Sequence, residues 1–538
     1  MTHVVETEVA PAGQGVGPCH TGPPSTNRCR HGDRLRGVAP TLVRDGRAFA
    51  LCTSLFLGLA VAVRAMVQLR WGTVTGLDTG NWLTLGHAWL GDSTTGTDST
   101  YPPVVPVAVA LLGELLSPLA TFVLLGAVAT ATYGGCAALV LWRAGCGWWS
   151  LPLALVLTGG SAAGEAVAWG GFPQLLGLGL ALLVLYLFAE LLVAPTVRTA
   201  WTLGGATLLL GATSHLVLAE AAVASALMVL LRFLSPLPRP TWRGLRRLSS
   251  VYVRALVPCL LLLPLYLRLT ATVGDSFAAR RDGQSRADLL HAVDLVIREL
   301  PALWRPAIVC ALLLPLVLWR ERHRPLWLVS ASLSLVLTLV AVASPEPRFA
   351  YLVPLLVVAA GGLLASSGPL TTRPLLHRLG VTVLAIGLAA SAVRGLDTFP
   401  GQVRYYGSYV PAGTIEALDD LRSGASRDAV VLVPPVRSIP FGWWIEGYGQ
   451  REAFVGSSPQ WLNFPRERQR AALAVRLFSA ADVLSDRWLA AVGAEGMDVV
   501  YLPANYDGTD TMVWQALMNR RPELVLHSSP AALILKVP

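Results

Sequence analysis

A carboxylate stands at the end of the first long apolar stretch of the chain, in the run Leu77-Asp78-Thr79-Gly80-Asn81-Trp82. Because about twenty apolar residues are enough to cross hydrocarbon, we expect Asp78 at the water boundary of a membrane. A carboxylate held there can take a proton from an attacking hydroxyl group, which is general-base chemistry. The alternative is that Asp78 only caps the short helix that follows it.

Further polar residues of chemically useful types lie near the ends of other apolar stretches: Glu165, Gln174, His215, Glu346 and Arg348. The last two belong to Pro345-Glu346-Pro347-Arg348, where two prolines fix an extended corner. The guanidinium of Arg348 can bind a phosphate through charge-assisted hydrogen bonds, and His215 can contact the same anion. Each has an alternative: Glu165 is an acid at a helix end, Gln174 joins helices by a hydrogen bond, and His215 is structural. Glu346 and Arg348 would then form a surface ion pair or contact a lipid headgroup.

Aromatic residues gather in one run near the carboxyl end, Phe441-Gly442-Trp443-Trp444-Ile445-Glu446-Gly447-Tyr448. Flat aromatic faces beside a hydrogen-bonding acid suit a sugar or another extended acceptor. Trp443, Trp444 and Glu446 are therefore candidate acceptor-binding residues. The same residues would serve equally well to dock this part of the chain on the membrane part.

The elements that must position these residues follow from composition. The chain has 538 residues, of which 54% are hydrophobic and 14% charged, so it is too apolar for an ordinary soluble protein. We predict a polytopic α-helical membrane protein with about eleven transmembrane helices. The expected spans are 49–70, 119–142, 150–168, 172–194, 199–214, 216–234, 251–271, 302–319, 326–343, 350–367 and 379–395. The apolar stretch 104–118 is expected to be an interfacial helix, with a twelfth span as the alternative.

The arginines predict the orientation. They concentrate in residues 1–46, which we expect to be a disordered cytoplasmic tail, and in alternate loops, which the positive-inside rule places in the cytoplasm. The outer loop 272–300 also carries arginines, but acids balance them. The formal net charge of +9 therefore reflects membrane orientation, and we expect no nucleic-acid partner.

The remaining sequence divides into a transmembrane domain, 47–395, with a large first outer loop, 71–118, and an extracytoplasmic α/β domain, 396–538. Strand-length apolar runs alternate with helical stretches in the last of these. The expected strands are 429–433, 498–502, 524–527 and 532–537, and the expected helices lie near 413–423, 465–480, 486–494 and 510–520. In the first outer loop, Trp82, Leu85 and Trp89 share one side of a short helix, and we expect that side to lie in lipid. The seven cysteines show no disulfide framework and no CxxC metal site.

Taken together and in order, several features resemble the GT-C superfamily of integral-membrane glycosyltransferases. They are Asp78 in the first outer loop, Tyr101-Pro102-Pro103, Gly170-Gly171-Phe172-Pro173-Gln174, the outer His215, Glu346-Pro347-Arg348-Phe349 and a final α/β domain. The resemblance implies that Asp78 is a general base or a ligand of a catalytic metal, and that Arg348 contacts the phosphate of the donor. Trp443-Trp444-Ile445-Glu446-Gly447 also faintly resembles the WWDYG motif of oligosaccharyltransferases. Ile-Glu departs from that motif and no second acid stands beside Asp78, which argues against a peptide acceptor.

The reaction expected from this reading moves a hexosyl or pentosyl group from a polyprenyl-phosphate donor to an acceptor hydroxyl on the extracytoplasmic face, with inversion at C1. The acceptor is a glycan, a lipid or a protein, and membrane lipid is the other expected partner. Asp78, Asp92, Asp98 and Glu346 offer oxygen ligands for Mg²⁺ or Mn²⁺, but their spacing defines no site, so the use of a divalent metal stays open.

Two other classes compete with a transferase. A transporter of an envelope precursor would use the intramembrane residues Glu165, Glu220 and Arg254. Against it, the sequence shows no duplicated halves, and an outer α/β domain after the last span is unusual for a carrier. The third class is a non-catalytic scaffold of the cell envelope.

Overall fold

The computed structural model of the protein describes residues 32–91, 101–233, 242–268, 304–343, 351–367, 374–434, 441–457, 465–480, 482–504 and 511–538. Asp92, Asp98, Glu346, Arg348 and the loop 272–300 lie outside these ranges, as does most of the expected tail. The chain separates into two units, Met1–Leu51 and Cys52–Pro538. The first contains the beginning of α1 (Gly32–Trp71), which starts inside the expected tail. The paragraphs below concern the second unit.

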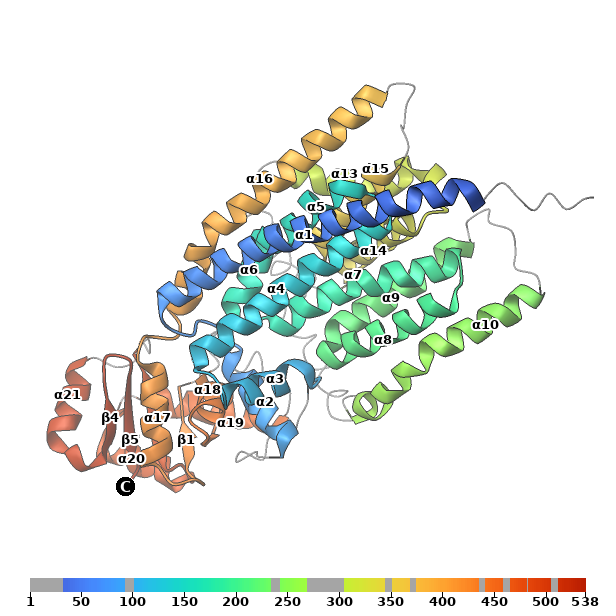
Figure 1. The fold of residues 1–538 in the computed structure, drawn as a ribbon. Coiled ribbons are helices and arrows are strands. Elements are labelled where there is room, and N and C mark those ends of the chain that lie inside the picture. The colour runs from blue at the N-terminus through green and yellow to red at the C-terminus, as the bar shows by residue number, and fades with distance from the viewer. Residues whose placement is uncertain are drawn as a thin grey trace, which may run out of the picture. The chain divides into compact units, whose positions relative to one another are not determined.

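Long apolar helices make up most of this unit (Figure 1). Within the described residues, seven helices are long and apolar enough to cross a membrane, and the chain is a polytopic membrane protein. Each of the eleven expected spans coincides with a helix or a helix pair, although the number of crossings stays a prediction. The helices are α1, α4 (Pro118–Arg143), α5 (Ser150–Gly159), α6 (Ser161–Trp169), α7 (Phe172–Val193), α8 (Val197–Thr213), α9 (His215–Phe233), α10 (Trp242–Leu256), α13 (Trp304–Val317), α14 (Pro325–Ala343), α15 (Leu352–Ser366) and α16 (Pro374–Gly407).

Small residues let these helices approach one another. A Cβ atom on Gly179 of α7 would lie 2.8 Å from Cα of Tyr133 in α4, and one on Gly134 of α4 would lie 1.9 Å from the hydroxyl of Thr158 in α5. Because lipid tails are as apolar as leucine side chains, helices in a membrane associate largely through close packing of this kind. The outward faces instead carry large exposed apolar side chains, including Leu124 on α4.

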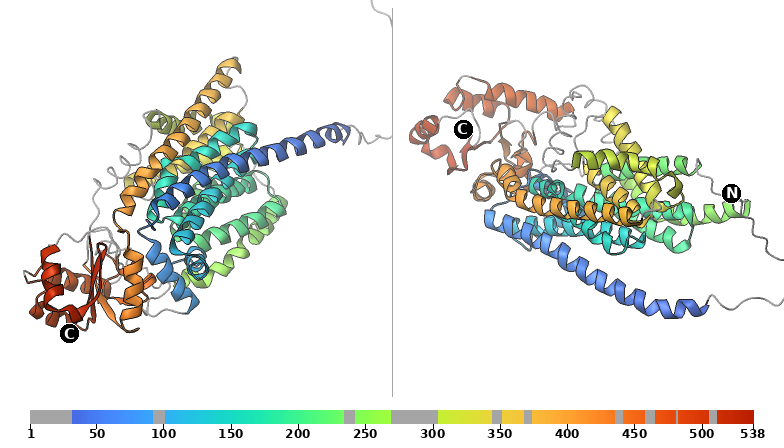
Figure 2. Two further views of the ribbon diagram at one scale, coloured as in Figure 1. Left: turned by 60° about the vertical axis from the view of Figure 1, so that its left-hand side comes forward. Right: turned by 90° about the horizontal axis from the view of Figure 1, so that it is seen from above.

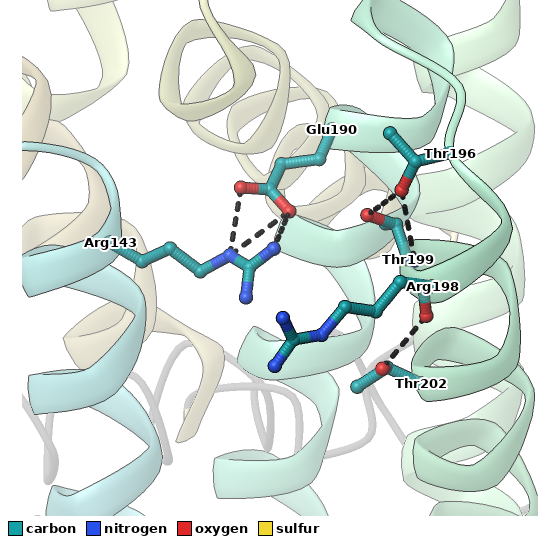
Figure 3. Close-up of polar contacts among 6 residues, drawn as sticks. All are labelled: Arg143, Glu190, Thr196, Arg198, Thr199 and Thr202. Atoms are coloured by element: carbon teal, nitrogen blue, oxygen red, sulfur yellow. Dashed lines mark hydrogen bonds and ion pairs between the residues drawn. The ribbon is translucent and has the colours of Figure 1, made fainter.

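Two arginines, Arg143 and Arg198, lie near each other at the carboxyl end of α4 and the start of α8 (Figure 3). Arg143, the last residue of α4, donates from Nε and Nη2 to the carboxylate of Glu190 in α7, at 2.9 Å in each case. Thr196 caps α8 by accepting the Thr199 amide at 3.1 Å, and Arg198 extends from the same turn. This ion pair joins two helix ends where the positive-inside rule predicts cytoplasm.

The first outer loop contains two short helices, α2 (Thr79–Leu90) and α3 (Val104–Gly113). The prediction that one side of α2 lies in lipid is wrong, because Trp82 and Leu85 are each only 5% exposed. That side packs against protein, and a Cβ on Gly86 would meet the carbonyl oxygen of Pro106 in α3 at 2.2 Å. With ten residues, α3 is about 15 Å long and too short to cross hydrocarbon.

The carboxyl-terminal part contains a five-stranded sheet in the order β2-β1-β3-β5-β4. Strands β2 (Glu452–Ala453) and β3 (Val499–Pro503) run parallel to β1 (Val430–Leu432), and β5 (Ala532–Lys536) is antiparallel to β3 and β4 (Val525–Ser528). The four strands predicted from the sequence are present, and so are the helices α17 (Thr414–Gly424), α19 (Pro465–Phe478), α20 (Asp486–Ala494) and α21 (Thr511–Arg520). Both views in Figure 2 show these strands and helices as one group that follows α16.

Two elements of this part, α18 and β2, were not predicted. The aromatic run, for which no helix was predicted, forms the helix α18 (Phe441–Gly447). The strand β2, which follows it, is only two residues long and escaped prediction for that reason.

Candidate active site

The carbonyl end of α6 holds the first outer loop. Three successive carbonyl groups at this end have no partner within their own helix, as is usual at a helix carboxyl terminus. Each accepts a hydrogen bond from the loop: Thr75 Oγ1 to Ala168 O at 3.2 Å, Asp78 N to Trp169 O at 3.2 Å, and Trp82 Nε1 to Gly170 O at 2.7 Å. The position of Asp78 is therefore set by α6.

Glycines make this contact possible. Gly170 has a φ of +89°, a conformation that favours glycine, and it ends α6. A Cβ on Gly76 would lie 2.6 Å from the ring of Phe122 and 3.1 Å from Cα of Gly170. The loop and the Gly170-Gly171 turn thus approach backbone to backbone.

Asp78 precedes α2 but its side chain does not cap that helix. Only its main-chain oxygen takes part, by accepting the Trp82 amide at 3.0 Å. Capping by the side chain, the alternative given for Asp78, is therefore not seen, and its catalytic role stays a prediction.

Trp169 joins Asp78 to the segment that follows Arg348. Its carbonyl accepts the Asp78 amide, and its indole Nε1 donates to the hydroxyl of Tyr351 at 3.1 Å. Tyr351 is the first described residue after the Glu346-Arg348 corner, three residues from Arg348. Arg348 itself lies outside the described residues, so its place beside Asp78 stays a prediction.

Glu165 and Gln174 lie on either side of the same turn. The carboxylate of Glu165, in α6, accepts a hydrogen bond from the hydroxyl of Tyr406 in α16 at 3.0 Å. Gln174, in the first turn of α7, is 5% exposed. Both residues thus flank the Gly170-Gly171 turn that binds the Asp78 loop, and their predicted role as pocket residues stays a prediction.

His215, the first residue of α9, reaches the loop through an aromatic residue. Its ring meets Tyr101 edge-on with centroids 4.9 Å apart, and the ring of Tyr101 lies 4.8 Å from that of Trp82. Tyr101 was not among the predicted site residues, although the Tyr-Pro-Pro run was noticed. Glu220, also on α9, is buried.

The helix α18 packs directly on α2. Trp444 is fully buried and its Nε1 donates to the carbonyl of Leu77 at 3.0 Å, next to Asp78. Thr84 donates to the carbonyl of Trp443 at 3.2 Å. These are the contacts of docking, which was the alternative to acceptor binding for both tryptophans.

Glu446 contacts other elements. Its carboxyl accepts the Ala453 amide of β2 and lies near Glu467 and Arg470 of α19. The pKa of Glu446 is raised to about 8, first by burial and then by the neighbouring carboxylates of Glu467 and Glu452, against the smaller opposing effects of the amide and of Arg470. Glu446 is therefore protonated at neutral pH.

This raised pKa predicts how stability depends on pH. The native state binds the proton of Glu446 more tightly than the unfolded state, so the stabilisation is complete below the ordinary carboxyl pKa and is lost as the pH rises through about 8. We expect Glu446→Gln to melt like the wild type at pH 5 and at least about 2 °C higher at pH 9. Thermal unfolding in detergent at the two values checks this. Melting curves that differ equally at both pH values would contradict it.

Among the described residues, no group of three or more His, Cys, Asp or Glu side chains could hold a metal ion. Asp92, Asp98 and Glu346, three of the four proposed oxygen ligands, lie outside those residues. Metal use therefore stays open.

Comparisons with known proteins place this fold. No protein-family model matches the chain, and no curated protein sequence matches it. Its structure is similar to ArnT from Cupriavidus metallidurans bound to undecaprenyl phosphate, with a TM-score of 0.52 and 12% identity over 90% of this chain and 97% of that one. For the apo form of ArnT, the TM-score is 0.54 and the identity 14%, over 91% of this chain and 98% of that one. For arabinofuranosyltransferase AftD from Mycobacteria, the TM-score is 0.53 and the identity 15%, over 90% of this chain and 41% of that one.

These neighbours are membrane glycosyltransferases of the GT-C type, so the resemblance predicted from the sequence is confirmed at the level of the fold. The chain therefore shares the fold of these neighbours over about nine-tenths of its length.

Proposed function

We propose that this protein is a membrane glycosyltransferase that moves a sugar from a polyprenyl-phosphate donor to an acceptor hydroxyl. The observation that carries the proposal is the double contact of Trp169, which binds the Asp78 amide on one side and Tyr351 on the other. It supports one site that contains both a base and the arginine corner. The fold shared with ArnT, which was solved with undecaprenyl phosphate bound, supports the donor class.

In the proposed reaction, the acceptor hydroxyl oxygen attacks C1 of the sugar while Asp78 takes the hydroxyl proton. The bond between C1 and the phosphate oxygen breaks, and its electron pair leaves with the polyprenyl phosphate. Attack opposite the leaving group inverts the configuration at C1. Arg348, helped by His215, offsets the charge that grows on the departing phosphate, and this effect is strong where water is scarce.

The proposed orientation has the amino terminus in the cytoplasm and the site, with the carboxyl-terminal domain, on the extracytoplasmic face of the plasma membrane. Arg143 and Arg198 at the opposite helix ends support it. The acceptor is a glycan, lipid or protein. Acceptor binding by Trp443, Trp444 and Glu446 stays a prediction, because the contacts of these residues in the structure are made within the protein.

A donor panel tests the proposed function. Purified protein in detergent is incubated with polyprenyl-phosphate hexoses and pentoses and an extract of envelope acceptors, and free polyprenyl phosphate is measured. We expect one donor to be consumed. If no donor reacts, while proteoliposomes take up a precursor without chemical change, the transporter is favoured instead.

The arginine corner gives a second prediction. Arg348→Ala should raise the KM for the donor about 10- to 100-fold, since hydrogen bonds to a charged group contribute about 1.5–3 kcal/mol, while the KM for the acceptor changes little. Arg348→Lys keeps the charge but loses the bidentate hydrogen bonding, so its KM for the donor should lie between those of the wild type and Arg348→Ala. Initial rates at varied donor and acceptor check this. Equal losses for both substrates would mean that Arg348 only shapes the corner.

A further inference from the structure

The helix α6 is held at its amino end as well as at its carbonyl end. The chain breaks at Gly160, whose extended conformation (φ −65°, ψ 158°) separates α5 from α6. Arg64 of α1 donates from Nη2 to the carbonyl of Gly160 at 2.7 Å. Gln402 of α16 donates from Nε2 to the carbonyl of Ser161 at 3.1 Å. Side chains of α1 and α16 thus hold the start of α6 by hydrogen bonds.

Arg64 is an unusual residue for the interior of an apolar span. It is 2% exposed, and its guanidinium lies over the ring of Phe399 at 5.2 Å. A guanidinium keeps its charge, and charges within a membrane are expensive and usually functional. Among the described residues, no ion pair is recorded for Arg64, and its Nε and Nη1 atoms have no hydrogen-bond partner.

The carboxyl end of α5, at the break before α6, can stabilise the positive charge of Arg64 in place of a counter-ion. Gly160 follows the last residue of α5, and the carboxyl end of a helix carries partial negative charge, which favours a cation. A Cβ on Gly164 would lie 2.5 Å from Gln402 Oε1 and 3.0 Å from the ring of Phe399. Glycine at 164 therefore lets the side chains of α1 and α16 close on α6.

The other end of the same helix holds Asp78. With nine residues, α6 is about 14 Å long, short enough to act as a stiff rod. Its middle is tied to α16 by the bond between Tyr406 and Glu165. A shift at Gly160 would therefore be transmitted to the carbonyl groups of Ala168, Trp169 and Gly170, which bind the loop.

We propose that Arg64 and Gln402 are positioning residues that fix α6 at the Gly160 break and thereby set the place of Asp78. The expected effect on kcat rests on the proposed function. The expected effect on the position of the Asp78 loop does not. Neither residue touches the reacting atoms. Their effect is transmitted through α6 to the first outer loop.

The kinetic test uses Arg64→Met, which keeps the length of the side chain but removes its charge and its bond to Gly160. Because a misplacement near 1 Å can cost about 100-fold in rate, we expect kcat to fall about 10- to 100-fold with both KM values nearly unchanged. Arg64→Lys can still donate to one carbonyl and should recover part of the rate. A parallel rise of KM without loss of kcat would overturn the proposal.

A matched control comes from the same face of α1. Gln68 is 2% exposed, lies one helical turn nearer to the Asp78 loop than Arg64, and its Nε2 has no hydrogen-bond partner among the described residues. Gln68→Met should keep the kcat of the wild type. A loss equal to that of Arg64→Met would show that any polar deletion on this face matters, and would overturn the specific role of Arg64.

A readout without activity separates this inference from the proposed function. Hydrogen exchange of the peptide covering residues 72–82, which contains the Asp78 amide, should be faster in Arg64→Met than in the wild type and unchanged in Gln68→Met. Wild-type rates in Arg64→Met would overturn the positioning role even if transfer is observed. An inactive wild type would remove the transferase proposal and leave the exchange result standing. If Arg64→Met does not fold, Gln402→Leu, which removes the bond to Ser161, is measured in the same way.

Discussion

Asp78→Asn is expected to lower the rate of sugar transfer by about 10²- to 10⁴-fold, the usual contribution of a general base. Asparagine has nearly the same shape but cannot take the proton of the acceptor hydroxyl. The two hydrogen bonds that hold this position, Asp78 N to Trp169 O and Trp82 N to Asp78 O, are made by the main chain and remain. The side chain does not cap α2, so the variant keeps the start of this helix that the main chain sets.

Release of polyprenyl phosphate, measured beside the melting temperature, checks this expectation. Asp397→Asn is the matched control, because the Asp397 side chain is 68% exposed and, among the described residues, pairs with Arg394 at 3.2 Å, a surface ion pair that contributes little. The control should keep full activity. Full turnover by Asp78→Asn would remove Asp78 from the chemistry.

Gly80→Ala is expected to separate α2 from α18 and to reduce both stability and activity. The added Cβ would lie 2.7 Å from Cα of Trp444 and 2.8 Å from the carbonyl oxygen of Trp443, and a main chain cannot turn away as a side chain can. Overpacking of this kind costs about 1–3 kcal/mol of stability. It also strains the bond from Trp444 to Leu77, next to Asp78, so we expect kcat to fall about 100-fold.

Thermal unfolding and limited proteolysis of the carboxyl-terminal domain, together with kcat, measure this effect. Gly401→Ala is the control, because a Cβ at this position of α16 meets no atom within 4 Å. Alanine is the better helix former, so the control should be as stable as the wild type or slightly more so. If Gly80→Ala melts and reacts like Gly401→Ala, the contact between α2 and α18 does not matter for the site.

The helices and most strands could be predicted because they depend on local patterns. Each apolar stretch of spanning length coincides with a helix or a helix pair, and strand-length runs predicted β1, β3, β4 and β5. The side of α2 that carries Trp82 and Leu85 could not be assigned, because an apolar side chain in a membrane protein faces lipid or protein with nearly the same sequence pattern. The break at Gly160 was missed for a similar reason, since α5 and α6 together read as one span.

The roles of the predicted site residues stay predictions, but part of their arrangement follows from where helices end. The Asp78 loop binds the end of α6, Glu165 and Gln174 lie on either side of the turn after α6, and His215 contacts Tyr101. The aromatic and hydroxyl side chains that connect them, Tyr101, Trp169, Tyr351 and Tyr406, were missed, since such residues at helix ends read as membrane-interface aromatics. Arg64 carried a signal that could have been used: an arginine inside an otherwise apolar stretch is rare without a role.

The most direct measurement is an experimental structure of the protein with polyprenyl phosphate bound. We expect the phosphate to accept hydrogen bonds from Arg348, with the Asp78 carboxylate no further from it than the length of one sugar residue. A phosphate bound elsewhere, or an Arg348 side chain at the other end of the helix bundle from Asp78, would contradict a single transfer site.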